Sequence, residues 1–214
     1  MSDVIERRTF TATIEVRADD GAAVAAGHAA VFDRLSQNLG GFVEVVAPGA
    51  FSKTITEQDV RALYNHNEDY VLGRLGAGTL RLVEDDDGLS YEVDLNPNDP
   101  DAVRVQAKLA RGDVIGSSFG FRVIDDEWGE TDQGFPLRTL KQVSLRDVGP
   151  VTFPAYTDST AALRSLAENR SLDLDRVVAA AQAGDLGDLI STRSRDDGRE
   201  TPTVVRPRLT WLTS

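Results

Sequence analysis

Residues 114–124 read VIGSSFGFRVI, a run whose apolar and aromatic residues are typical of a buried β-strand. Neighbouring side chains of a strand point to opposite faces, so Ser117 and Ser118 are expected to have different surroundings. Ser117 shares its face with two phenylalanines, which is typical of a core. Ser118 lies between two glycines, whose bare backbone leaves room for another chain to approach. The first face comprises Ile115, Ser117, Phe119, Phe121 and Val123, and the second comprises Val114, Gly116, Ser118, Gly120, Arg122 and Ile124.

Strands dominate the rest of the main body. A hairpin over residues 72–95 gives the clearest signal, because leucines and a tyrosine alternate with polar residues around the turn DDDG. The acidic run Glu84–Asp87 at its tip is interpreted as a solvated turn rather than a metal site. Many short strands with one or two helices predict a mainly β fold, a β-barrel or related closed sheet with flanking helices. Further strands are predicted over residues 8–17, 27–32, 60–64 and 139–148, the last ending at Gly149-Pro150.

Helices are predicted at three places. One begins at Asp99, which can cap it, continues through Pro100 and stops at Gly112. The run AFSKTI after Pro48-Gly49 is compatible with a short helix that has proline near its first turn. Residues 172–190 read as a helical segment broken by glycines, and the following residues are polar. We therefore expect a domain over residues 1–165 and a helical to poorly ordered C-terminal tail over residues 166–214.

The composition bounds the function. The chain has 214 residues and a net charge of −12, which argues against a nucleic-acid-binding surface because phosphate contacts need clustered Lys and Arg. It contains no cysteine, which excludes thiolate nucleophiles and cysteine-based zinc sites. The N-terminus lacks the apolar core of a signal peptide, and no run approaches membrane length, so we expect an intracellular protein with no membrane partner. The arginine-containing residues 191–214 are either a solvated tail or a docking segment.

Candidate chemistry centres on few polar residues. His66 lies where a strand pattern gives way to the polar run NHN, whereas His28 lies among small apolar residues and is interpreted as packing. Asp147 falls on the predicted strand face of Val143 and Leu145. It needs a hydrogen-bond donor there if it is buried, and otherwise it lies at an exposed strand end. A lone histidine is also commonly structural, so position alone leaves both interpretations open.

Ser118, His66 and Asp147 together supply the parts of a serine nucleophile system. A serine hydroxyl needs a neighbouring base, an imidazole has a suitable pKa to take and return its proton, and a carboxylate fixes the imidazole tautomer. Spacing alone does not decide the assignment, because triads are defined by geometry. A metal hydrolase has little support, since the two histidines are far apart and no HExxH motif is present. We expect no cofactor and no metal.

Several motifs occur in a fixed order between about residue 9 and residue 165. They are GHAAVFD, VAPGAF, VRALYNHN, VLGRLGAGTLRL, DGLSYEVDL, LARGDVIGSSFGFRV, VSLRDVGPVTFPAY and STAALRS. With this set the chain resembles the HK97-type family of phage prohead (capsid maturation) proteases. The resemblance implies a serine endopeptidase with a β-barrel fold similar to that of herpesvirus assemblins. By motif, the family's histidine falls on His66 and its serine on Ser118, while Asp147 is the only carboxylate in VSLRDVGPV.

The resemblance also implies a biological setting. Such enzymes act in the host cytoplasm inside the assembling procapsid, where they cleave a scaffold protein or the scaffold-like segment of the major capsid protein, and often themselves. The related viral enzymes suggest a dimer. The alternative hypothesis is a non-catalytic scaffold or capsid-assembly protein that shares the fold.

Overall fold

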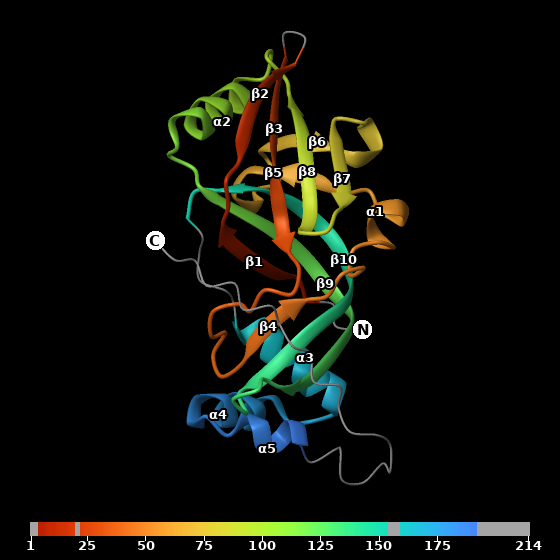
Figure 1. Ribbon diagram of the computed structural model, residues 1–214, viewed down its shortest axis with the longest axis vertical. Coiled ribbons are helices and arrows are strands. Elements are labelled where there is room, and N and C mark those ends of the chain that lie inside the picture. The colour runs from red at the N-terminus through yellow and green to blue at the C-terminus, as the bar shows by residue number, and fades with distance from the viewer. Residues whose placement is uncertain (1–3, 20–21, 154–158, 192–214) are drawn as a thin grey trace.

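The computed structural model describes residues 4–19, 22–153 and 159–191, which form two β-sheets with helices around them (Figure 1). The larger sheet, here sheet A, has the order β1-β9-β10-β5-β6, and β4 also pairs with β10. The smaller one, sheet B, has the order β2-β3-β8-β7. Sheet A contains β1 (Glu6–Thr11), β4 (Val43–Val46), β5 (Arg61–Leu63), β6 (Val71–Arg74), β9 (Gly116–Glu130) and β10 (Pro136–Val151). Sheet B contains β2 (Glu15–Asp19), β3 (Ala22–Val31), β7 (Leu80–Glu84) and β8 (Gly88–Leu95).

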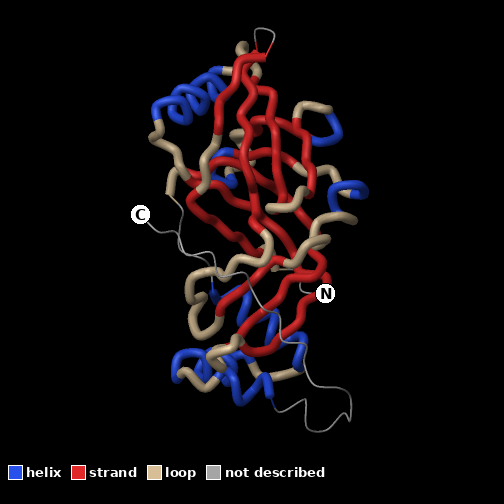
Figure 2. Tube along the Cα trace, in the orientation of Figure 1, coloured by secondary structure: helices blue, strands red, loops and turns tan. Residues whose placement is uncertain are grey.

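The strands β9 and β10 form a long antiparallel pair that runs from the sheets to the C-terminal helices (Figures 1 and 2). Phe119 and Phe121 of β9 stack with ring centroids 4.9 Å apart, and Phe51 packs edge-on against Phe119 at 5.4 Å. These rings belong to one core cluster that also includes Tyr91 and Val93 of sheet B. The apolar face predicted for residues 117–123 therefore lies between the two sheets.

Helices and short turns connect and flank the strands. Helix α2 (Pro100–Arg111) begins and ends as predicted, because the Asp99 side chain accepts from the Asp101 amide and Gly112 adopts a left-handed conformation at the C-terminus. The C-terminal helices pack on a second cluster, which includes Phe42 and Trp128. The remaining elements are α1 (Thr54–Glu57), η1 (Tyr64–His66), η2 (Leu75–Ala77), α3 (Ser159–Arg170), α4 (Leu174–Ala183) and α5 (Leu186–Ser191).

The predicted mainly β architecture with flanking helices is confirmed, but the predicted β-barrel is not formed, because the two sheets are not closed into a barrel. The predicted hairpin is observed over residues 80–95 as β7 and β8, whereas residues 72–77 belong to β6 of sheet A and to η2. The helical segment over residues 172–190 is also observed. The domain boundary near residue 165 stays a prediction, and residue 165 lies within α3. Residues 192–214 of the predicted tail lie outside the described part of the chain.

Three strand predictions need correction. Residues 8–17 do not form one strand, because the chain leaves sheet A after β1 and enters sheet B at β2. Strand β10 does not stop at Gly149-Pro150. Proline is tolerated there because Pro150 lies beyond the pairing with β5 and is paired only with β9. Ile115 precedes β9 and is half exposed, so the predicted alternation holds only from Gly116 onward. The predicted start of the short helix in AFSKTI also needs correction. This helix, α1, begins after Lys53, so Pro48 is not in its first turn.

A buried ion network fixes β1 to the rest of sheet A. The guanidinium of Arg138, on β10, is fully buried and contacts Glu6 of β1 at 2.8 Å and Asp126 of β9 at 2.7 Å. Arg8 of β1 pairs with Glu6 and with Glu44 of β4, each at 2.7 Å. A guanidinium has several donors in a fixed plane, so each arginine can bind two carboxylates at once. The network therefore ties together four strands.

The same network reaches the C-terminal helices. Arg138 donates to the Ser165 hydroxyl of α3 at 3.1 Å and lies 5.6 Å from the centroid of the Trp128 ring. Buried charges are costly unless they are paired and hydrogen-bonded, and these groups meet that condition. The packing of α3 against β10 is therefore linked to the ion network.

Replacing Arg138 by alanine should destabilise the fold strongly. The change leaves Glu6, Glu44 and Asp126 buried with less counter-charge, so the free energy of unfolding should fall by about 3–5 kcal/mol. Urea denaturation measures it. The matched control is Arg81→Ala on sheet B, because Arg81 pairs with Asp94 and its side chain is 43% exposed. The control should cost about 1 kcal/mol or less. Equal losses in both variants would contradict a special role for the buried network.

Acid should destabilise the protein through Glu6. Burial alone would raise the pKa of Glu6, but attraction to Arg138 and Arg8 outweighs it and holds the pKa below its ordinary value of 4.5. The stabilisation is therefore fully present above the unfolded-state pKa and is lost as pH falls through the lower folded-state pKa. We expect the free energy of unfolding, measured between about pH 6 and pH 3, to fall less steeply in Glu6→Gln than in the wild type. Parallel curves would show that Glu6 does not contribute.

Candidate active site

The three predicted residues come together on one face of sheet A. The Nε2 atom of His66 lies 2.5 Å from the Ser118 hydroxyl, and its Nδ1 atom lies 2.5 Å from Oδ2 of Asp147. An ionised carboxylate can only accept hydrogen bonds, so these partners assign the proton of neutral His66 to Nδ1. Nε2 is then an acceptor that faces the hydroxyl.

Asp147 reaches this face through a β-bulge. Leu145 pairs with Phe121 and Asp147 pairs with Gly120, so one residue of β10, Arg146, has no partner in the ladder. Paired residues of neighbouring strands point to the same side, and Gly120 is on the Ser118 side of β9. The prediction that Asp147 shares a face with Leu145 was therefore wrong, because simple alternation does not allow for the extra residue. Of the two alternatives left open for Asp147, the structure has the buried and bonded one.

Gly120 provides the space that the Asp147 carboxylate occupies. A Cβ atom on Gly120 would lie 2.5 Å from Oδ1 of Asp147, closer than non-bonded atoms approach. The sequence suggested that the glycines beside Ser118 admit another chain. At Gly120 the neighbour is instead this side chain.

Ser117 and Ser118 differ as their predicted faces require. The Ser117 hydroxyl faces the core and lies 3.4 Å from the Tyr91 hydroxyl. The Ser118 hydroxyl faces His66 and also lies 2.8 Å from the backbone carbonyl of Arg8 on β1. A hydroxyl has one proton, so His66 and this carbonyl are alternative acceptors for it. Neither serine is exposed to solvent.

His66 lies in an unusual turn between β5 and β6. Asn65 and His66 both have a φ angle of 55°, in the left-handed region that residues other than glycine rarely adopt. The Asn65 side chain bonds to Thr152, directly after β10, through its oxygen at 2.7 Å and its nitrogen at 3.1 Å. Neither Asn65 nor Thr152 was predicted from the sequence to be a site residue. The adjacent residues NHN were a signal for the turn, because asparagine and histidine are enriched in left-handed conformations.

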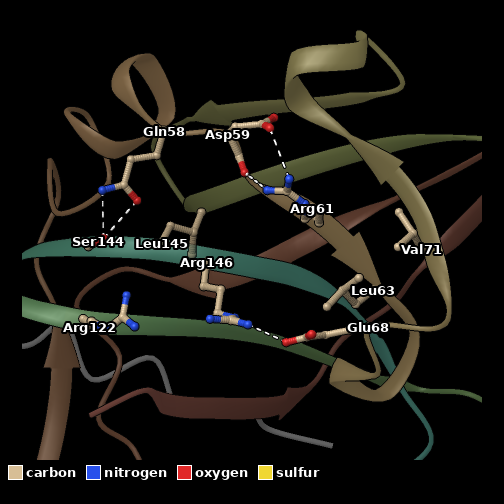
Figure 3. A pocket seen from close by; sticks show the side chains of 10 residues that line it. All are labelled: Gln58, Asp59, Arg61, Leu63, Glu68, Val71, Arg122, Ser144, Leu145 and Arg146. Carbon is tan, nitrogen blue, oxygen red and sulfur yellow. Dashed lines mark hydrogen bonds and ion pairs between the residues drawn. The ribbon is translucent and has the colours of Figure 1, made fainter. Parts of the chain in front are cut away.

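Two pockets flank this turn. A pocket of about 320 Å³ lies on the Ser118 side and is lined by Arg7, Thr9, Asn65, His66, Val151, Thr152 and Phe153. A larger pocket of about 520 Å³ is lined by residues of β5, of β10 and of the loop after His66 (Figure 3). In Figure 3, Arg146 reaches the Glu68 carboxylate across this pocket, and Arg61 contacts Asp59. The bulged residue Arg146 thereby links β10 to the loop that follows His66. The lining residues are Gln58, Asp59, Arg61, Leu63, Glu68, Val71, Arg122, Ser144, Leu145 and Arg146.

The other histidine and the acidic hairpin tip form a separate group. His28 is not packed among apolar residues, as the sequence suggested, but is partly exposed and lies 3.0 Å from Asp85. His28, Asp85 and Asp87 hold ligand-type atoms within 4.8 Å of one another. One oxygen of Asp85 accepts from the amides of Asp87 and Gly88, as expected for a turn-forming aspartate. Glu84 is not simply solvated, because its carboxylate accepts from the Phe51 amide.

The chain is similar to known proteins over most of its length. Among the described helices, none has the length and apolarity that a membrane span requires. The chain is 26% identical over 171 residues to the prohead protease of Enterobacteria phage HK97, covering 78% of this chain and 72% of that protein. The structure of the bacteriophage T4 capsid assembly protease matches with a TM-score of 0.43 and 11% identity, over 70% of this chain and 98% of the other. A model of the Caudovirus prohead serine protease family matches residues 12–172, three quarters of the sequence, and the chain belongs to this family.

Proposed function

We propose that the chain is a serine endopeptidase of phage capsid maturation, with Ser118, His66 and Asp147 as its catalytic residues. The observation that carries the proposal is the imidazole of His66, which lies within hydrogen-bond distance of both the Ser118 hydroxyl and the Asp147 carboxylate. Membership of the prohead serine protease family supports the same reaction class. The proposed substrates are a scaffold protein or the scaffold-like segment of the major capsid protein, inside the assembling procapsid.

In this proposal each of the three residues has its own step. Ser118 Oγ attacks the scissile carbonyl carbon while its proton passes to Nε2 of His66. Asp147 accepts from Nδ1, holds the reactive tautomer and stabilises the imidazolium that forms. Nε2 then gives the proton to the leaving amine as the C–N bond breaks, which leaves an ester on Ser118. Water attacks this ester with His66 again as base, and the hydroxyl of Ser118 is restored.

Access to the nucleophile is part of the proposal. Ser118 has no exposed surface, and its hydroxyl lies between His66 and the carbonyl of Arg8. His66, which faces this hydroxyl, and Thr9 both line the pocket of about 320 Å³. We infer that a substrate peptide enters there and displaces a neighbouring group before the scissile carbonyl reaches Ser118. Self-cleavage in the tail over residues 166–214 and self-association as a dimer stay predictions.

Removing the nucleophile should abolish cleavage. Ser118→Ala should lower kcat by about four orders of magnitude or more, because the attacking oxygen is absent. The assay is co-expression with the major capsid protein of the same phage, followed by N-terminal sequencing of the fragments. The matched control is Ser117→Ala, which removes only a long contact with Tyr91 and should leave cleavage within a few-fold of wild type. Full activity in Ser118→Ala would overturn the assignment, and loss in Ser117→Ala alone would transfer it to that residue. No cleavage by the wild type would favour the non-catalytic assembly role.

Asp147→Asn should retain the fold and lose most of the rate. Asparagine has nearly the same shape but can donate to Nδ1, which favours the wrong imidazole tautomer, so kcat should fall by about 10⁴-fold. Peptide hydrolysis and thermal unfolding are measured on the same preparation. His28→Gln is the control, since the partner of His28 is Asp85 in the turn between β7 and β8. An Asp147→Asn enzyme with wild-type kcat would exclude the proposed role of the carboxylate.

A further inference from the structure

The turn that presents His66 is attached to the end of β10 by a compact set of polar contacts. The Thr152 amide donates to Oδ1 of Asn65 at 2.7 Å, and Nδ2 of Asn65 donates to the Thr152 hydroxyl at 3.1 Å. The Tyr64 hydroxyl lies 2.6 Å from the same Thr152 hydroxyl. Both polar ends of the Asn65 amide are therefore used, and both bind one residue. Such a two-point contact fixes the direction of the side chain as well as its distance.

The backbone of this turn needs external support. Two successive residues, Asn65 and His66, are held in the left-handed region, where side chains other than glycine crowd the backbone. Strained backbone of this kind persists only where the surroundings fix it. The backbone also lies very close to β10, because a Cβ atom on Gly149 would come within 2.2 Å of the Leu63 carbonyl oxygen. The chain is thus placed against β10 at Leu63 as well as at Asn65.

Ser118 and Asp147, the two partners of His66, are held by a different kind of local structure from the one that holds His66. Ser118 and Asp147 belong to long strands whose ladder hydrogen bonds fix them. His66 belongs to a three-residue 3₁₀ turn that follows a three-residue strand. Loss of the turn conformation would therefore move the imidazole and leave the serine and the carboxylate in place.

We propose that Asn65, acting through Thr152, is a positioning residue that holds His66 in the left-handed turn from which its imidazole bridges Ser118 and Asp147. The role in catalysis rests on the function proposed above, whereas the role in holding the imidazole does not. Asn65 does not touch the reacting atoms in this scheme. Its contribution is to keep the His66 imidazole within hydrogen-bond distance of the Ser118 hydroxyl.

The first test separates the hydrogen bonds from the backbone preference. Asn65→Gly accepts the left-handed conformation but lacks the amide, so kcat should fall by about 10–100-fold with KM within about threefold. Asn65→Asp keeps the acceptor for the Thr152 amide and can accept from the Thr152 hydroxyl, so it should recover a large part of the lost rate. Thr152→Val removes the hydroxyl but keeps the amide that donates to Asn65, so it should reproduce part of the loss, whereas Thr152→Ser should retain the wild-type rate. The loss caused by Thr152→Val should shrink in the Asn65→Gly background, because Asn65→Gly already removes the contact with the Thr152 hydroxyl.

The matched control is Asn67→Ala in the same loop. The Asn67 side chain accepts from the Asp69 amide and does not contact Thr152, so this variant should stay within about twofold of wild-type kcat. Equal losses in Asn65→Gly and Asn67→Ala would overturn the proposal in favour of a general effect on the loop. Wild-type kcat in Asn65→Gly would also overturn it.

The second test measures an NMR signal of the His66 imidazole and does not depend on proteolytic activity. The chain has two histidines, so His28→Gln leaves His66 as the only source of imidazole NMR signals. A proton held between Nδ1 and Asp147 should give a downfield resonance in this background and in Asn67→Ala. The resonance should be lost or broadened in Asn65→Gly and Thr152→Val. An unchanged resonance in both variants would overturn the positioning role even if activity fell. If the wild type cleaves nothing but the resonance depends on Asn65, the proposed function fails and the positioning role stands.

Discussion

The antiparallel pairing of β9 with β10 is the constraint on which both the fold and the site depend. This pair crosses the molecule, supplies the phenylalanines of the main core and carries Trp128 and Arg138 to the C-terminal helices. Its register also decides the chemistry. With one extra residue at Arg146, β10 shows leucine to the core at position 145 and a carboxylate to the opposite face at position 147. A strand with strict alternation could not do both.

Strand β1 connects the ion network to the candidate site. The side chain of Arg8 pairs with buried carboxylates on one side of the strand, while its backbone carbonyl lies against the Ser118 hydroxyl. The register of β1 on β9 therefore sets the environment of the nucleophile. The buried charge pairs of the ion network fix that register. They therefore also determine the position of the Arg8 carbonyl, although these charged groups are far from His66 in the sequence.

The site is assembled from exceptions to regular structure. Three such exceptions occur at the site: the bulge at Arg146, the missing Cβ of Gly120 and the left-handed turn at His66. None of them indicates a function when it is considered alone. Together they bring a hydroxyl, an imidazole and a carboxylate from three segments to within hydrogen-bond distance. Local departures from regular geometry are expected at functional sites, where the surrounding structure compensates for them.

The sequence by itself determined the strand that contains Ser117 and Ser118, the opposite environments of these two serines, and the caps of α2. These properties depend on local patterns, namely alternation along a strand and capping residues at helix ends. It also pointed to His66 and Asp147, but it placed Asp147 on the wrong face. Only the tertiary structure decided that face, the transfer of the chain from sheet A to sheet B between β1 and β2, and the attachment of Asn65 to Thr152. Each of these depends on contacts between residues far apart in the chain, such as Gly120 with Asp147, and a periodic pattern in one segment has no information about the register of its partner.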